Sequence, residues 1–415
     1  MNILLLGNGF DLYHLFPTKY VNFLNTVSFL ANTRQYDINT VGDVFGKIEL
    51  HKTDCGIAAS YQEYKDTYNS VQIDPIAIQQ LITLGKKNIW FSFLQKSFNK
   101  DLGWIDFEQE IAVVLKSFEE LLQKTDIKIN FKARLSTVES RYLVKFFAFY
   151  LNSSKSDDSW TGALYVKDEY TIEYPLGSNN KIINKEKIVN ELAKALEELA
   201  EALKLYLQCF VDNVVTKLKS AKKIKLCDAL KYTDYTVSFN YTNTYEILYS
   251  GNQVFHLHGN VNDKIILGIN PDSADEVGTI DTSFIRFKKY YQRVLYETDM
   301  GYLQWLTQSR NRVENRNLLI MGHSLDITDK DIIFELIECA SSVTVLYHSE
   351  GAKGQYISNL VKIFGRERFI QLRAEKGLTF LPLSMDFSAF AQERAEQQAF
   401  EEFCEGFDQG EIGIV

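Results

Sequence analysis

The first residues of the chain place a short apolar strand directly before a turn that contains two glycines. Leu4–Leu6 carry no polar side chain, which is typical of a strand buried on both faces of a parallel sheet. Gly7 and Gly9 follow at once, and glycine lets the backbone turn tightly and approach its neighbours closely. Apolar residues at helical spacing resume after residue 18. A strand, a glycine turn and a helix in this order are used by α/β proteins to bind nucleotide phosphates.

The turn by itself leaves two interpretations open. The dinucleotide-binding pattern G-x-G-x-x-G has a third glycine, and Leu12 stands in its place. A tight turn in an ordinary α/β core therefore explains Gly7 and Gly9 as well as a phosphate loop does.

Composition narrows the class of protein. The 415 residues are enough for two or three domains, or for one domain with a large insertion, and 46% of them are hydrophobic, which favours a packed core over disorder. The net charge of -9 argues against a general nucleic-acid-binding surface. Five scattered cysteines without a C-x-x-C pair give no sign of a structural zinc site. No signal peptide or membrane span is visible, so we expect a cytoplasmic protein.

Hydrophobic periodicity predicts an α/β fold with a Rossmann-like, mostly parallel sheet. Residues 36–75 are mixed and polar, with turn signals at Asp54–Gly56 and at Asp74–Pro75. The pattern is helical from residue 76 to about 151, a polar loop or small hairpin is expected over 152–182, and a long amphipathic helix is expected over about 184–218. Beyond it, strands alternate with helices, which is typical of a parallel sheet. The expected strands are 235–239, 253–257, 264–269, 317–321 and 342–347, and the expected helices are 282–309, 329–339 and 352–364.

These patterns predict three regions. Residues 1–70 and 226–385 form the Rossmann-like domain, which is discontinuous in sequence. Residues 71–225 form a mainly helical insertion, and residues 386–415 form a helical tail.

Polar residues follow several of the predicted strands. Asn240 ends one strand, His258 and Gly259 end the next, and Gly322 and Ser324 follow a third. Because the carboxyl ends of parallel strands are where open α/β sheets bind ligands, we expect these loops to surround one pocket. Histidine moves protons near neutral pH, so His258 is a candidate general base. Asn240 can hold a carboxamide, a ribose hydroxyl or a water, although an Asx turn is its commoner use.

Other polar residues have simpler interpretations. His256 precedes His258 by two residues, but no carboxylate or cysteine cluster nearby supports a metal site. Thr328 and Asp329 stand before an apolar helix, where a capping role is expected for one or the other. Asp106 and Glu108 open another helix and complement its dipole, with a catalytic carboxylate as the less common alternative.

Taken together, these segments resemble the bacteriophage abortive-infection AbiH family. The resemblance rests on four motifs that span nearly the whole chain, and the segment Trp104–Glu108 fits the same family. The motifs are Gly7-Asn-Gly-Phe-Asp11, Ser238-Phe-Asn-Tyr-Thr242, His256-Leu-His-Gly259 and Gly322-His-Ser-Leu325.

The order of the motifs also resembles the sirtuin superfamily, which implies NAD as the ligand. The resemblance assigns the phosphate turn to Gly7, Asn8, Gly9, Phe10 and Asp11. It assigns the reacting end of NAD to Asn240, Thr242, His258 and Gly259. It assigns the adenosine side to Gly322, His323 and Ser324.

Three departures from the sirtuin pattern shape the functional expectation. Thr242 replaces an aspartate that holds the nicotinamide amide, Asp11 replaces a serine in the phosphate turn, and the zinc-binding cysteines are absent. The chain therefore resembles the sirtuin-like effectors of phage defence, which hydrolyse NAD, more than it resembles protein deacylases.

The sequence thus yields one leading hypothesis and two rivals. The leading hypothesis is an anti-phage effector that hydrolyses NAD to ADP-ribose and nicotinamide, with His258 and Asn240 as catalytic residues and no zinc. It implies a phage-derived trigger and allows a homo-oligomer. The first rival is a nucleotide sensor or interaction protein without turnover. The second is a metal-dependent, nuclease-like effector that uses Asp11, Asp106 and Glu108.

Overall fold

The structure is a computed structural model of the 415-residue chain. It describes residues 1–32, 38–50, 54–97, 107–122, 128–130, 151–153, 163–173, 181–222, 226–227, 230, 233–249, 253–269, 282–298, 300–310 and 315–383. The predicted tail 386–415 and the helical pattern expected over 134–150 lie outside these residues.

The chain divides into two compact units, each built from separate stretches of sequence. The sheet unit comprises residues 1–16, 211–260 and 298–415, and the helical unit comprises residues 17–210 and 261–297. The helical unit therefore consists of two segments of the chain. In chain order, one segment follows the first strand of the sheet and the other follows the third. By this division, residues 17–70 group with the helices rather than with the strands.

A six-stranded parallel sheet forms the centre of the sheet unit. Its strand order is β11-β10-β9-β1-β7-β8, and every neighbouring pair is parallel. The strands are β1 (Asn2–Leu6), β7 (Tyr235–Ser238), β8 (Gln253–His256), β9 (Asn317–Met321), β10 (Ser342–Tyr347) and β11 (Thr379–Pro382). Numbered in chain order, this arrangement reads 6-5-4-1-2-3, which is the doubly wound Rossmann order. The predicted α/β fold with a parallel sheet is confirmed.

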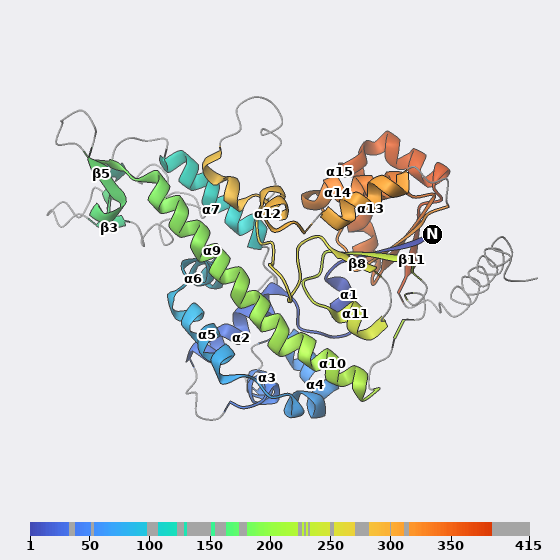
Figure 1. The fold of residues 1–415 in the computed structure, drawn as a ribbon, viewed down its shortest axis with the longest axis horizontal. Coiled ribbons are helices and arrows are strands. Elements are labelled where there is room, and N and C mark those ends of the chain that lie inside the picture. The colour runs from blue at the N-terminus through green and yellow to red at the C-terminus, as the bar shows by residue number, and fades with distance from the viewer. Residues whose placement is uncertain are drawn as a thin grey trace, which may run out of the picture. The chain divides into compact units, whose positions relative to one another are not determined.

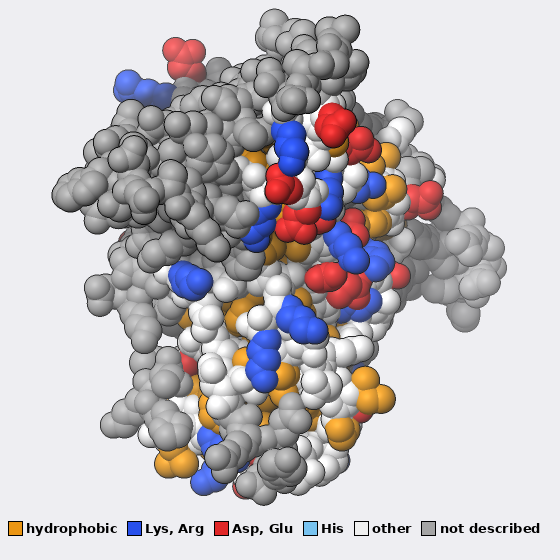
Figure 2. Space-filling model, turned by 90° about the vertical axis from the view of Figure 1, so that its left-hand side faces the viewer, with side chains coloured by type: hydrophobic (Ala, Val, Ile, Leu, Met, Phe, Trp, Pro, Cys, Tyr) orange, Lys and Arg blue, Asp and Glu red, His pale blue; other side chains and the backbone are white. Residues whose placement is uncertain are grey.

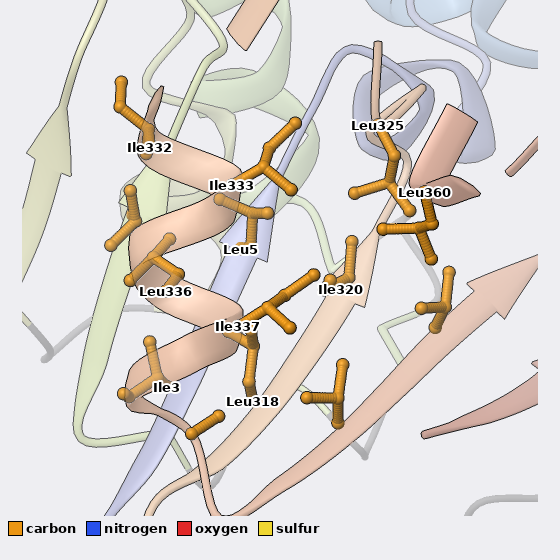
Figure 3. Close-up of a cluster of buried hydrophobic side chains, with 14 of the residues drawn as sticks. Ile3, Leu5, Leu318, Ile320, Leu325, Ile332, Ile333, Leu336, Ile337 and Leu360 are labelled. Carbon is orange, nitrogen blue, oxygen red and sulfur yellow. The ribbon is translucent and has the colours of Figure 1, made fainter. Parts of the chain in front are cut away.

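The core of the sheet unit lies on both faces of β1. Ile3 and Leu5 belong to one buried cluster, and Leu4 and Leu6 belong to a second one. Side chains alternate along a strand, so an uninterrupted apolar run is what a strand covered on both faces requires. Figure 3 shows the first cluster, in which side chains of α14 (Lys330–Cys339) lie over β1 and β9.

The helices of the sheet unit are labelled in Figure 1. Besides α14, they are α1 (Gly9–Tyr13), α10 (Asn213–Ser220), α11 (Thr244–Tyr249), α13 (Met300–Arg310) and α15 (Glu350–Glu375). A short 3-10 turn, η7 (Ile327–Asp329), precedes α14.

The helical unit is built mainly from packed helices with two small antiparallel sheets. Its helices are α2 (Tyr20–Asn32), α3 (Val41–Leu50), α4 (Cys55–Ser70), α5 (Pro75–Lys87), α6 (Ile89–Ser97), α7 (Phe107–Leu122), α9 (Lys185–Leu207), η6 (Thr282–Phe287) and α12 (Lys289–Tyr296). Its strands are β2 (Lys128–Asn130), β3 (Leu151–Ser153), β4 (Ala163–Val166), β5 (Thr171–Glu173) and β6 (Lys181–Ile183), and the 3-10 turn η2 (Asp168–Tyr170) precedes β5.

Two sequence predictions of secondary structure were wrong. Residues 264–268 form no strand, although Ile265, Ile266 and Leu267 are buried, because a buried apolar run looks the same in a strand and in an irregular segment. Residues 41–50 and 55–70, whose mixed and polar pattern predicted no element, form α3 and α4. The turn signal at Asp54 is a helix cap, since its carboxylate accepts hydrogen bonds from the backbone amides of Gly56 and Ile57.

Charged side chains of opposite sign pair on the surface of the helical unit. Lys264 lies 2.6 Å from Glu201, and Lys181 lies 2.6 Å from Asp168. Figure 2 shows basic and acidic side chains interspersed on one face of the molecule. None of the described helices combines enough length and apolar character to cross a membrane.

The turns that follow β1 and β9 touch backbone to backbone. The Gly9 amide donates to the Gly322 carbonyl at 2.8 Å, and the Gly7 amide donates to the Met321 carbonyl at 3.1 Å. A Cβ atom on Gly9 would lie 2.6 Å from the Gly322 Cα atom, and one on Gly322 would lie 2.2 Å from the Phe10 nitrogen. Gly322 also has a φ of +71°, which side chains rarely tolerate. A side chain at Gly9 or at Gly322 would prevent this contact, so both positions require glycine.

We expect Gly322→Ala to destabilise the protein by about 2–4 kcal/mol, through backbone strain and overpacking together. The change in the free energy of unfolding is measured by urea denaturation. Gly354→Ala is the matched control, because Gly354 lies exposed in α15 and a Cβ atom there would meet no heavy atom within 4 Å. That control should be neutral or stabilising, by up to about 1 kcal/mol. Equal urea midpoints for the two variants would contradict this account.

Candidate functional site

The predicted site residues follow four strands that are neighbours in the sheet. In the order β9-β1-β7-β8, the segments beyond the strand ends carry Gly322, Gly7, Asn240 and His258. Parallel strands end at the same edge, so these segments lie together although they are more than 300 residues apart in the chain at the extremes. In doubly wound folds, ligands bind beyond this edge near the point where the strand order reverses, which here is at β1 and β9.

Asp11 is the polar centre of the site. Its side chain lies on α1, and the residue is 1% exposed. Its Oδ2 atom accepts a hydrogen bond from the Thr242 hydroxyl at 2.7 Å and a longer one from the Asn240 amide at 3.4 Å. Its Oδ1 atom and the Oδ1 atom of Asn240 are buried and have no hydrogen-bond partner among the described residues. Three predicted site residues therefore meet here, with two buried acceptor oxygens.

Burial changes the acidity of Asp11. Loss of solvent raises the pKa of its carboxyl from 3.8 to about 6, although the Thr242 hydrogen bond acts in the opposite direction. The nearby Thr244 hydroxyl also lowers this pKa, but it does not reach hydrogen-bonding geometry. Asp11 is thus ionised at neutral pH and becomes protonated as the pH falls through about 6.

Asp212 is a second buried carboxylate, which the sequence did not single out. Its Oδ2 atom accepts hydrogen bonds from the backbone and side-chain amides of Asn243, at 3.1 and 2.9 Å. Burial raises its pKa to about 7, and the negative charges of Asp11 and Glu246 act in the same direction. It ends the π-helical segment Gln208–Asp212, which interrupts the regular helical spacing. Hydrophobic periodicity marks apolar positions, so it gave no signal for a buried aspartate.

His256 belongs to a different contact set from His258. Its Nε2 atom contacts the Glu246 carboxylate, and its Nδ1 atom lies 3.0 Å from the Asn240 carbonyl. Burial lowers the pKa of His256, but the Glu246 carboxylate outweighs this effect, so the pKa lies above its usual value. The imidazole is therefore occupied as an ion-pair partner.

His258 faces Asp329. The His258 Nε2 atom lies 3.3 Å from Asp329 Oδ1, and the His323 Nε2 atom lies 3.6 Å from Asp329 Oδ2. All three residues are buried. The Phe239 ring packs against both imidazoles, with centroid distances of 5.1 Å to His258 and 4.3 Å to His323. An acid between two histidines at the sheet edge is an arrangement that can hold or move a proton.

The other residues that the sequence predicted for the site differ in burial and in backbone conformation. Phe10 is fully buried in the core, where its ring packs against Tyr245. Asn8 and Ser324 are exposed. Gly259 has a φ of +71°, a conformation that favours glycine.

The carboxylates expected in the helical insertion are only partly described. Glu108 forms a 2.8 Å ion pair with the buried Lys289 within the helical unit. Trp104 and Asp106 lie outside the described residues. Among the residues that the structure describes, no group of three or more His, Cys, Asp or Glu side chains is arranged to hold a metal ion.

We expect Asp11→Asn to stabilise the protein at about pH 8 by about 2–3 kcal/mol, and the gain to vanish near pH 4. The native pKa of about 6 exceeds the unfolded value of 3.8, so the native state binds the proton more tightly. Stability is therefore lost as the pH rises through this window, and an uncharged side chain avoids the loss. Thermal unfolding at a series of pH values measures the effect.

Glu338→Gln is a control of opposite sign in the same unit. Its hydrogen bonds from Arg368, at 2.8 and 2.6 Å, lower the pKa of Glu338. Glu338→Gln should therefore lose stability at about pH 8. The variant Asp11→Asn should gain more stability over the unsubstituted protein at pH 8 than at pH 4. An equal gain at both pH values would contradict the buried-charge account.

Comparison with known proteins adds the family. The family model described as bacteriophage abortive infection AbiH matches residues 3–348. No curated protein and no solved structure matches the chain. The match includes every strand of the sheet except β11, and all of the site residues described above. The chain therefore belongs to the bacteriophage abortive-infection AbiH family.

Proposed function

We propose that this protein hydrolyses NAD to ADP-ribose and nicotinamide when it acts in abortive infection. The observation that carries the proposal is the pair of buried acceptor oxygens on Asp11 and Asn240, in the same sheet-edge cluster as an imidazole that faces a carboxylate. The sequence supports NAD as the substrate, because the four motifs follow one another in the same order as in sirtuins.

The acceptor oxygens suit a ribose. A ribose presents neighbouring hydroxyl groups, and each can donate a hydrogen bond to an oxygen that otherwise has no donor. Asp11 Oδ2 is already bonded to Thr242, which fixes the orientation of the carboxylate. The proposal thus gives Asp11 a role at the sugar, rather than at the pyrophosphate, where its negative charge is unfavourable.

The chemistry follows from the charge that develops during bond cleavage. The bond between ribose C1′ and the nicotinamide nitrogen breaks, neutral nicotinamide leaves, and positive charge accumulates on the ribose. An ionised Asp11 stabilises that charge in a buried setting. Water then bonds to C1′, and His258 accepts the proton that the water loses. Asn240 positions the water or the ribose hydroxyl.

Single substitutions of His258 and Asn240 test the proposed reaction. His258→Ala and Asn240→Ala should each reduce NAD turnover at least about 100-fold, because each removes a positioned polar group from the reacting centre. Nicotinamide release by purified protein is the measurement, together with NAD levels in cells that carry the gene during phage infection. His348→Ala is the matched control, because His348 is an exposed histidine beyond the end of β10.

The two arms of this experiment decide the class of function. If purified protein is inactive because a phage-derived trigger is missing, infected cells supply that trigger. NAD that persists both in the tube and in infected cells protected by the gene would rule out hydrolysis. Loss of turnover in His348→Ala as well would show that the effect is not specific to His258.

Nucleotide binding without turnover is the second candidate. The feature that favours it is Thr242, which stands where sirtuins have the aspartate that holds the nicotinamide amide. A sensor of this kind would melt at a higher temperature with NAD present and would release no nicotinamide. Homo-oligomer formation is compatible with either function.

A further inference from the structure

Asp329 occupies a helix-capping position without acting as a cap. It immediately precedes α14, yet its side chain makes no capping hydrogen bond. The preceding turn has its own cap, since the Asp326 carboxylate accepts a hydrogen bond from the Thr328 amide at 3.1 Å. Aspartate at such a position usually binds the helix amides. Here the carboxylate is directed elsewhere, so capping does not explain it.

The Asp329 carboxylate instead lies between two imidazoles. Its oxygens are 3.3 Å from His258 Nε2 and 3.6 Å from His323 Nε2. His323 has a defined orientation, because its Nδ1 atom accepts a hydrogen bond from the Leu325 amide at 2.9 Å. A neutral His323 therefore carries its hydrogen on Nε2, the atom that faces Asp329. His323 thus faces one carboxylate oxygen while the other oxygen faces His258.

We propose that Asp329 is the positioning residue that makes His258 an effective base, and that His323 fixes Asp329 in place. The inference rests on the proposed function for the reaction that His258 catalyses. A carboxylate beside an imidazole stabilises the imidazolium that forms when the base takes a proton, and it fixes the ring orientation.

Asp329 places a negative charge 3.3 Å from the His258 imidazole. Two aromatic rings also face the imidazole: the phenol of Tyr241, at a centroid distance of 6.3 Å, and the apolar ring of Phe239, at 5.1 Å. His323 faces the same carboxylate from the β9 side. Replacing Asp329 with Asn therefore removes the charge of this carboxylate and keeps the size of the side chain.

The test combines a titration with kinetics on the full chain. The histidine ring signals of ¹⁵N-labelled protein are followed by NMR against pH, and the His258 signal is identified by its loss in His258→Ala. In Asp329→Asn, the His258 midpoint should move to lower pH by about one unit, because the opposite charge is gone. In NAD hydrolysis, kcat should fall about 100-fold with an unchanged KM. Asp329→Glu keeps the negative charge, so it should recover part of the His258 midpoint and part of kcat.

Asp326→Asn is the control, since Asn keeps the capping oxygen and the Asp326 carboxylate bonds the Thr328 amide. It should leave the His258 midpoint unchanged. If folded Asp329→Asn shows the same His258 midpoint as the unsubstituted protein, the inference is overturned whatever the NAD result. If the midpoint moves but NAD is consumed neither by the purified proteins nor in infected cells, the His258–Asp329 pair stands and the proposed reaction fails. If Asp329→Asn does not fold, Asp329→Ser, which also removes the charge, is compared with Asp326→Asn, and an unchanged His258 midpoint in Asp329→Ser overturns the inference.

Discussion

The contact between the glycine turns after β1 and β9 is the constraint on which the site depends. Gly9 and Gly322 approach so closely that neither accommodates a side chain, and backbone hydrogen bonds join the two turns. This contact fixes the start of α1, and with it the place of Asp11 beside Thr242. It also fixes His323, which follows Gly322 directly and faces Asp329. Two strand ends that are distant in sequence thereby become one polar cluster.

Burying these polar side chains costs free energy, and the hydrophobic core around the sheet offsets that cost. Burial raises the pKa values of Asp11 and Asp212 to about 6 and about 7, which means that the fold opposes their ionisation. Ile3–Leu6 of β1 are almost completely buried, so both faces of the sheet contribute hydrophobic stabilisation next to this polar edge. Buried acids with shifted pKa values are typical of functional sites, and this is the physical basis for placing the proposed chemistry here.

Much of the fold could be predicted from the sequence, because local patterns carry it. The strands near 235, 253, 317 and 342 are apolar runs bounded by polar turns, and each was found. The edge strand β11 was missed, because it is short and ends at Pro382, which is tolerated only at an edge. Asp54 was interpreted as a turn residue although it caps α4, since both uses place an aspartate at a chain reversal. Asp329 was interpreted as a cap, because the sequence does not show which way a side chain turns.

The sequence by itself determined the parallel α/β architecture and the residues that follow its strands, since periodicity and glycine placement are local properties. Only the tertiary structure decided which of these residues meet. The approach of Asn240 to Asp11, and of Asp329 to His258, depends on strand order and on the packing of α14, which join residues far apart in the chain. The glycine turn is the clearest case: the sequence allowed close backbone approach at Gly7 and Gly9, and the structure identified the partner as the turn at Gly322.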